Sequence, residues 1–269
     1  MKPRILILTA GFGEGHNAAA RAVATACDAQ HGPGTAHVAD IFALTSPRLN
    51  SVSRKAYLGM INRAPNLWNR AYQWFDRSTL FPRLLQLMRG EIRVLADLIA
   101  SVKPTAVCST YPIYAFHLAA LARDGRLRAP FFNIVTDSIS INSLWWRAGA
   151  KCWFLPNEAS ADVLRGVGLD GRQLQVTGFP VPVFFEDNAG RLAPPDLHAG
   201  TVPRVLYIIN SVTPAAAQTA RRLLADTPWE ITCTVGRNAA LGRELTLLAA
   251  RRPPPAGSSV GRMRFPACS

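Results

Sequence analysis

The N-terminal part of the chain contains a glycine-rich turn that ends in a residue able to take up a proton. The turn comprises Gly11, Gly13, Gly15, His16 and Asn17. It follows the apolar run 5–8 and precedes an alanine-rich stretch, which predicts a buried strand, a turn and a helix capped by Asn17. The positive end of a helix attracts anions and disfavours a charged imidazole. His16 should therefore stay neutral, as a general base must, although a structural, hydrogen-bonded histidine is the simpler alternative.

The spacing of the glycines differs from two common phosphate-binding motifs. The dinucleotide fingerprint is G-x-G-x-x-G, whereas this turn reads G-x-G-x-G, and no Gly-Lys-Ser/Thr follows as in a P-loop. Asp40 nevertheless ends the next expected strand, 36–41, where a nicotinamide-dependent oxidoreductase would bind a ribose. That function is kept as a third possibility, but an acid at a strand end or a helix start explains Asp40 more simply.

Further candidates lie at the ends of two later expected strands, which begin at Thr105 and Pro130. They are Tyr111, Thr136, Asp137, Asn142 and Trp145. Parallel strands place their carboxyl ends at one edge of the sheet, where open α/β sheets bind ligands. Asp137 would then lie beside His16 and could orient it; the alternative is an Asp that caps the following turn. Asn142 cannot titrate, so only hydrogen bonding is open to it, and simple packing explains Tyr111 equally well.

These motifs, in this order, resemble the monogalactosyldiacylglycerol synthase and processive diacylglycerol glucosyltransferase family. The resemblance covers roughly residues 4–240 and continues through the landmarks Pro156-Asn157-Glu158 and Gly178-Phe179-Pro180-Val181. It implies a GT-B glycosyltransferase in which His16 is the catalytic base and Asp137 supports it. The substrate-binding positions that it implies are Gly11, Gly13, Gly15, Asn17, Tyr111, Thr136, Asn142 and Trp145.

The same resemblance implies a reaction and a set of partners. The enzyme would transfer a hexose from a nucleotide-sugar, expected to be a UDP-sugar, to a lipid hydroxyl such as that of diacylglycerol. We expect no cofactor, no metal ion and no nucleic-acid partner, and a cytoplasmic enzyme bound peripherally to the inner face of the cell membrane. A non-catalytic membrane- or anion-binding domain is the main alternative.

The composition fits a globular protein with an attraction to polyanions. The net charge is +13, and apolar residues make up 49% of the chain against 17% charged residues. Such a balance favours nucleic acid or an anionic membrane surface as partner. Five cysteines lie far apart without a C-x-x-C pair, which argues against disulfides or a zinc site and suits a reducing cytoplasm.

Residues 47–93 form a segment rich in arginine and aromatic residues, with Asp76 as the only acid before Glu91. Its leucines recur at roughly helical spacing, which predicts helices. Three interpretations compete: helices with a solvated basic face, an amphipathic surface that lies on a membrane, and a nucleic-acid-binding surface. In the family that the chain resembles, the matching region helps the enzyme to sit on the membrane, so we favour the membrane over nucleic acid.

The order of expected strands and helices predicts an α/β fold of GT-B type, with a parallel, Rossmann-like sheet in the N-terminal domain. We expect an acceptor-side domain at 1–185 and a Pro/Gly-rich linker at 186–203. The start of a donor-binding, Rossmann-like domain should follow at 204–250, incomplete because only two strands and two helices are expected there. Residues 251–269 read as a disordered or out-of-frame tail.

Overall fold

The computed structural model describes residues 2–48, 80–85, 87–191, 202–209, 214–236 and 238–251, together with scattered positions between 52 and 78. The chain divides into two compact units, Met1–Ala189 and Gly190–Ser269, which are described separately below. The division falls inside the expected linker 186–203. The expected tail lies outside the described residues, except for Arg251.

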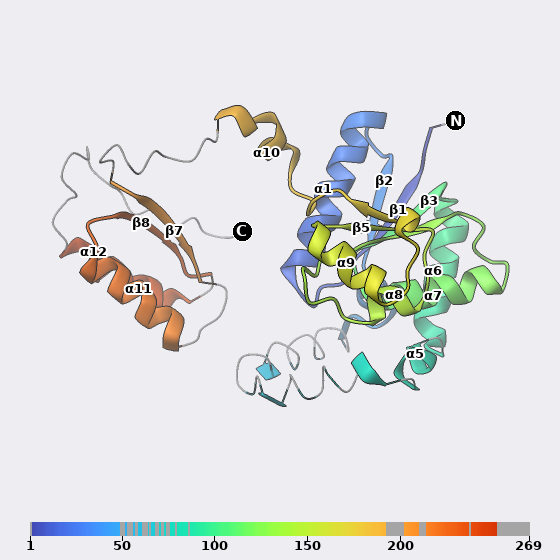
Figure 1. The fold of residues 1–269 in the computed structure, drawn as a ribbon, viewed down its shortest axis with the longest axis horizontal. Helices are drawn as coiled ribbons and strands as arrows, with labels where there is room; N and C mark the ends of the chain where they lie inside the picture. Colours follow the sequence, from blue (N-terminus) through green and yellow to red (C-terminus); the bar gives the residue numbers. More distant parts are fainter. Residues whose placement is uncertain are drawn as a thin grey trace. The chain divides into compact units, whose positions relative to one another are not determined.

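The first unit is built on a six-stranded parallel sheet with the strand order β2-β1-β3-β4-β5-β6 (Figure 1). The strands are β1 (Ile5–Leu8), β2 (Ala36–Ala39), β3 (Ala106–Ser109), β4 (Phe131–Ile134), β5 (Cys152–Leu155) and β6 (Leu174–Val176). The expected α/β class and parallel sheet are confirmed. The chain leaves β1 toward β2 on one side and returns to β3 on the other, so the strand order reverses there. Ligands of open α/β sheets bind outside the carboxyl ends of the strands at such a reversal.

Helices cover both faces of this sheet. The helices whose bounds the structure describes before the second unit are α1 (Glu14–His31), α2 (Ile41–Thr45), α5 (Leu80–Leu85), α6 (Arg89–Val102), α7 (Pro112–Arg123), α8 (Leu144–Arg147), α9 (Glu158–Gly166) and α10 (Val183–Asp187), and 3₁₀ turns lie at Gly171–Gln173 and Ala189–Arg191. Leu6 and Leu8 of β1 pack with α6 and α7 in the largest apolar cluster. Ile7, which alternates with them, is also fully buried. Coverage on both faces explains why β1 is continuously apolar.

Helix α1 begins four residues earlier than its cap chemistry predicts. Its N-cap is Gly13, with extended backbone (φ −164°, ψ 145°) and no side-chain cap, so the prediction of Asn17 as N-cap is wrong. Asn17 lies in the first helical turns, where its Oδ1 accepts a hydrogen bond from the Thr9 hydroxyl at 2.9 Å. The hydroxyl at the end of β1 therefore uses the oxygen that would otherwise have capped the helix.

The second unit contains β7 (Arg204–Ile208) and β8 (Glu230–Thr234), which pair in parallel, and the helices α11 (Pro214–Asp226) and α12 (Ala239–Ala250). Its apolar core joins the two strands to both helices around Leu224, Ile231 and Leu245. Leu206 and Ile208 alternate with the inward residues of β7 and are 60% and 55% exposed. The described part of this unit thus forms a β-α-β-α arrangement in which the sheet face that carries Leu206 and Ile208 is open.

His117 of α7 is fully buried beside Phe42 and Tyr114. Neither ring nitrogen forms a hydrogen bond with the part of the chain that the structure describes. The Leu85 backbone lies close enough to favour the charged ring weakly, but burial dominates and lowers the pKa of His117 to about 4. The folded protein therefore keeps this ring neutral, whereas the unfolded chain takes up a proton below its ordinary pKa of 6.5.

We expect this difference to make the fold sensitive to acid. The contribution of His117 to the free energy of unfolding is fully present above pH 6.5 and is lost as the pH drops toward 4. At pH 5 this loss amounts to roughly 2 kcal/mol. His117→Leu should remove that part of the loss, which urea unfolding at pH 7.5 and pH 5.0 can measure. His37→Leu, at an exposed position of β2, is the matched control. An equal acid loss in His117→Leu and wild type would contradict the assignment.

Candidate functional site

The carboxyl ends of β1, β3 and β4 bring together residues that are far apart in sequence. Leu8 pairs with Ser109, and Ser109 pairs with Asn133, so the residues that follow these strands emerge side by side. Helix α1 begins directly above β1 and carries His16 in its first turn. His16, Tyr111, Thr136, Asp137 and Trp145 all take part in the contacts described below, as expected from the sequence.

Two contacts at Nδ1 determine the tautomer of His16. This nitrogen lies 2.7 Å from the backbone oxygen of Thr110 and 2.8 Å from Oγ1 of Thr136. A carbonyl oxygen can only accept a hydrogen bond, so Nδ1 must carry the proton. In the neutral ring Nε2 is then left with its lone pair, which is the state that a general base requires.

The environment keeps the imidazole neutral while preserving some basicity. Burial lowers the pKa of His16 below its ordinary value, and the Thr110 carbonyl and the negative charge of Asp137 partly oppose this effect. The backbone around the ring is held as well, because the Thr110 hydroxyl lies 3.1 Å from the backbone oxygen of His16. The structure therefore fixes both the position and the protonation state of this side chain.

Asp137 is held by an indole, and no described cation pairs with it. Its Oδ2 accepts a hydrogen bond of 2.8 Å from Nε1 of Trp145, which is fully buried in α8. The Trp145 ring also lies near the imidazole, with centroids 6.3 Å apart. Trp145 thus orients the carboxylate without neutralising its charge, so the charge remains available to His16.

Aromatic rings line the other side of His16. The Tyr111 ring meets the imidazole edge to face, with centroids 5.0 Å apart. Phe12, from the glycine turn, stacks on Tyr111 with centroids 5.9 Å apart, and Phe42 contacts both rings edge to face. These rings restrict the imidazole to one orientation and give the site an apolar wall.

The glycines of the turn leave space beside His16, and the described ones do not adopt left-handed backbone angles. Neither Gly13 nor Gly15 has a positive φ, and a Cβ added at Gly15 would meet no atom within 4 Å in the described structure. The amide of Gly11 donates a hydrogen bond of 2.9 Å to Oδ2 of Asp40. An exposed helical glycine beside His16 leaves room for a ligand to approach the amino end of α1.

Asp40 has a structural role in this arrangement. It is the N-cap of α2, accepting from the Ala43 amide at 3.0 Å, and it also accepts from the Tyr114 hydroxyl at 3.2 Å. Together with the bond from Gly11, these contacts use both carboxylate oxygens. They support the simpler explanation of Asp40 and weaken the nicotinamide alternative, which needs this carboxylate to bind a ribose.

Two other candidate positions use their side-chain oxygens in contacts within the protein. Asn142 is buried, and its Oδ1 accepts a hydrogen bond of 2.9 Å from the Leu144 amide at the start of α8. Asn17 is occupied by Thr9, as described above. A role for either in substrate binding stays a prediction. Among the described residues, no group of three or more His, Cys, Asp or Glu side chains could hold a metal ion.

Sequence reasoning missed Thr110 and gave no role to Asp76. Asp76 anchors α8: its Oδ1 accepts from the Ser143 amide at 2.6 Å, and its backbone oxygen accepts from the Ser143 hydroxyl at 2.7 Å. A single acid within a long basic segment is a signal that could have marked it. Thr110 had no such signal, because it contacts His16 through its backbone carbonyl, and every residue type has one.

We expect nuclear magnetic resonance to find the proton of neutral His16 on Nδ1 and the pKa of this ring below 6.5. The measurement is a titration of the chain labelled with ¹⁵N-histidine, and His16→Ala assigns the signal. A neutral ring protonated on Nε2 would contradict the arrangement, because Nδ1 would then face the Thr110 carbonyl without a proton.

Comparison with known proteins shows that the sequence matches a known family. The family model described as monogalactosyldiacylglycerol (MGDG) synthase matches residues 16–181, which is more than half of the chain. The match begins at His16 and includes the Asp137 loop. The chain is also 24% identical over 186 residues to a processive diacylglycerol beta-glucosyltransferase of Bacillus thuringiensis and 23% identical to one of Bacillus cereus.

Those alignments cover 68% of this chain but 46% of each relative, so the chain spans about half the length of the curated relatives it matches. Among solved structures, the UDP-GlcNAc 2-epimerase of Neisseria meningitidis bound to UDP-GlcNAc has a similar fold. Its TM-score is 0.50 at 13% identity, over 93% of this chain and 70% of that one.

The resemblance noted in the sequence led us to expect a parallel sheet, a histidine at the start of the first helix and the Thr136-Asp137 loop with Trp145. The family match over residues 16–181 includes the last two of these features. The chain therefore belongs to the monogalactosyldiacylglycerol (MGDG) synthase family.

Proposed function

We propose that this chain is the acceptor-side half of a glycosyltransferase that moves a hexose from a nucleotide-sugar, such as a UDP-sugar, to the hydroxyl of diacylglycerol. The observation that carries the proposal is the neutral His16, with its unprotonated Nε2, at the strand-order reversal between β1 and β3. Membership of the MGDG synthase family and the names of the Bacillus relatives support the reaction class and the lipid acceptor.

In this mechanism, Nε2 of His16 accepts the proton of the acceptor hydroxyl. The acceptor oxygen then forms a bond to the anomeric carbon of the sugar, and the bond between that carbon and the nucleotide phosphate breaks. Negative charge develops on the leaving phosphate, which the amino end of α1 and the open space beside Gly15 could receive.

Asp137 has a supporting role in the same step. When His16 takes up a proton, the imidazolium gains a favourable interaction with the Asp137 carboxylate. Because the partner of the carboxylate among the described residues is the neutral Trp145 indole, this contact does not cancel its charge beforehand. The pair thus favours the charged ring when it forms, while burial keeps the resting ring neutral.

His16→Ala should lower glycosyl transfer by about 100-fold or more, the usual contribution of a general base. Transfer of labelled sugar from UDP-glucose and UDP-galactose to diacylglycerol vesicles measures it. His31→Ala, at the exposed last residue of the same helix, is the matched control. Equal transfer by His16→Ala and wild type would refute the role of His16, and no transfer by wild type from either sugar would count against activity of this chain.

A lipid acceptor requires contact with a membrane, and we propose a docking surface formed by residues around α2 and α5. It combines exposed leucines with exposed arginines: Leu44, Leu80, Leu84, Leu87, Arg48, Arg83 and Arg89. None of the described helices is both long and apolar enough to cross a bilayer. Arginines attract anionic headgroups, and leucines enter the interface, so a peripheral enzyme on the inner face of the cell membrane fits this surface.

The stretch that precedes α5 in the sequence is attached to the part of the site that holds Asp137. Asp76 binds Ser143 at the start of α8, and Arg147 at its end donates a hydrogen bond of 2.7 Å to the backbone oxygen of Ser78. The same short helix carries Trp145. Asp76 and Ser78 thus link α8, which carries Trp145, to the stretch that leads into α5.

Leu87→Asp should weaken binding to vesicles that contain anionic lipid, because a charge replaces an apolar side chain that is 64% exposed. Leu247→Asp is the matched control, since Leu247 is 66% exposed but lies in α12 of the second unit. Cosedimentation with vesicles at low and high salt measures both contributions. Equal loss in the two variants would contradict a localised docking surface.

A non-catalytic membrane-binding domain remains the alternative function, because the chain spans about half the length of its relatives. The same vesicles and a titration with UDP distinguish the two. Binding to vesicles without affinity for UDP and without glycosyl transfer favours the binding domain, whereas UDP affinity together with transfer favours the enzyme.

A further inference from the structure

The loop between β4 and α8 contains a residue in an unusual backbone conformation. Ile139 has φ +65°, in the left-handed region, and its side chain is 64% exposed. A β-branched residue rarely adopts a positive φ, because its Cβ approaches the following carbonyl oxygen. Such a conformation persists only where surrounding contacts hold it, and Ile139 follows Asp137 by two residues.

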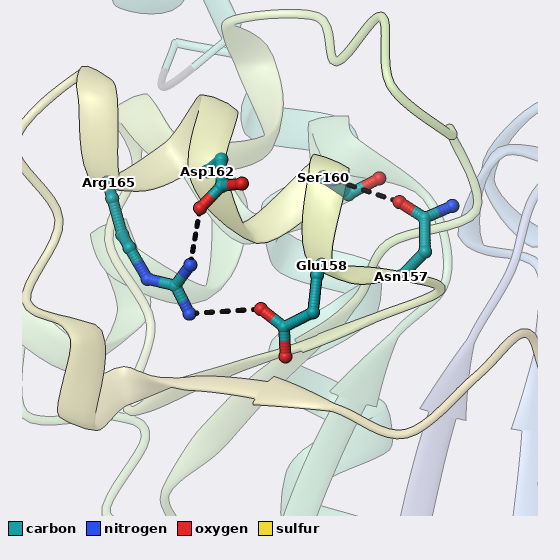
Figure 2. Close-up of polar contacts among 5 residues, drawn as sticks. All are labelled: Asn157, Glu158, Ser160, Asp162 and Arg165. Atoms are coloured by element: carbon teal, nitrogen blue, oxygen red, sulfur yellow. Dashed lines mark hydrogen bonds and ion pairs between the residues drawn. The ribbon is translucent and has the colours of Figure 1, made fainter.

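The contacts that hold this loop come from the amino end of α9. The Ile139 amide donates a hydrogen bond of 3.1 Å to Oγ of Ser160, which is fully buried. Nδ2 of Asn157 donates to Oγ of Ser138 at 2.8 Å. Figure 2 shows that Asn157 and Ser160 are themselves joined, because Oδ1 of Asn157 caps the helix by accepting from the Ser160 amide at 2.9 Å.

The other end of the same loop is fixed at the site. Oγ1 of Thr136 lies 2.8 Å from Nδ1 of His16, and Oδ2 of Asp137 is bound by the Trp145 indole. The four residues from Thr136 to Ile139 are therefore attached to the site at the first two positions and to α9 at the last two. A change in the backbone conformation of Ile139 therefore shifts Ser138, the residue that directly follows Asp137.

We propose that Ser160 is a positioning residue: by holding Ile139 in its left-handed conformation, it fixes the loop that places the Asp137 carboxylate beside His16. The proposal concerns the same site as the proposed function and rests on it for the meaning of that placement. Asn157 assists by binding Ser138. Neither residue touches His16, so both act through the loop.

The outer face of α9 has no part in this arrangement. Arg165 binds Glu158 at 3.2 Å and Asp162 at 2.6 Å, and these side chains are largely exposed. In Figure 2 these three residues form a group of their own, separate from the pair Asn157 and Ser160. Exposed ion pairs of this kind contribute little to stability, so Arg165→Ala is a matched control on the same helix.

The experiment measures the pKa of His16 by histidine NMR titration in the whole chain, a readout that needs no enzymatic activity. The titratable groups facing the ring are the Asp137 carboxyl and the Tyr111 phenol, and Glu14 of the same turn is paired with Arg21. Asp137 raises the pKa of His16, so its removal in Asp137→Asn should lower that pKa. Ser160→Ala should lower it in the same direction and by a smaller amount, and Arg165→Ala should leave it unchanged.

A second variant tests whether strain at Ile139 is the cause. Glycine adopts a positive φ without strain, so Ile139→Gly combined with Ser160→Ala should return the pKa of His16 toward its wild-type value. Ile139→Pro removes the amide donor and forbids a positive φ at an exposed position, so it should lower the pKa even if Ser160→Ala fails to fold.

An unchanged or raised pKa of His16 in folded Ser160→Ala, or in Ile139→Pro if the first variant does not fold, would overturn the proposal. Failure of the double variant to recover the pKa would also count against it. These outcomes are distinct from failure of the proposed function, because a chain without glycosyl transfer still reports the pKa of His16.

Discussion

The hydrogen bond between Nδ1 of His16 and the backbone oxygen of Thr110 determines what this site can do. It joins residues 94 positions apart in the sequence, at the carboxyl edge where β1 and β3 lie side by side. Because a carbonyl cannot donate, this one contact assigns the ring proton and leaves Nε2 as the basic nitrogen. The parallel register of β1 and β3 therefore determines which ring nitrogen carries the proton, because it places the Thr110 carbonyl beside Nδ1.

The remaining contacts at the site set the pKa of His16, whose ring this bond has already oriented. Burial and the charge of Asp137 act on the imidazole in opposite directions, which keeps it neutral at rest but able to accept a proton. The carboxylate is oriented by Trp145, and the loop that carries it is attached to α9 through Ser160. Helices α8 and α9 thus serve the site although neither contributes the proposed base.

The same architecture relates the site to the surface that we propose for lipid. Helix α8 carries Trp145 on its buried side and is bound at both ends by the stretch around Asp76 and Ser78. In the second unit, the sheet face that carries Leu206 and Ile208 is open, although parallel strands are usually covered on both faces. The contacts discussed for the base all join residues of the first unit.

The sequence alone determined the α/β class and the positions of the strands, because apolar runs and glycine turns are local signals, and its motifs singled out His16, Asp137 and Trp145 as candidates. The tertiary structure decided the rest. Helix α1 begins at Glu14, and Asn17 accepts a hydrogen bond from Thr9 instead of capping the helix, while Asn142 is buried just before α8. Thr110 and Ser160 have no sequence motif: one acts through a carbonyl and the other through a buried hydroxyl, and such roles exist only once the partner is beside them.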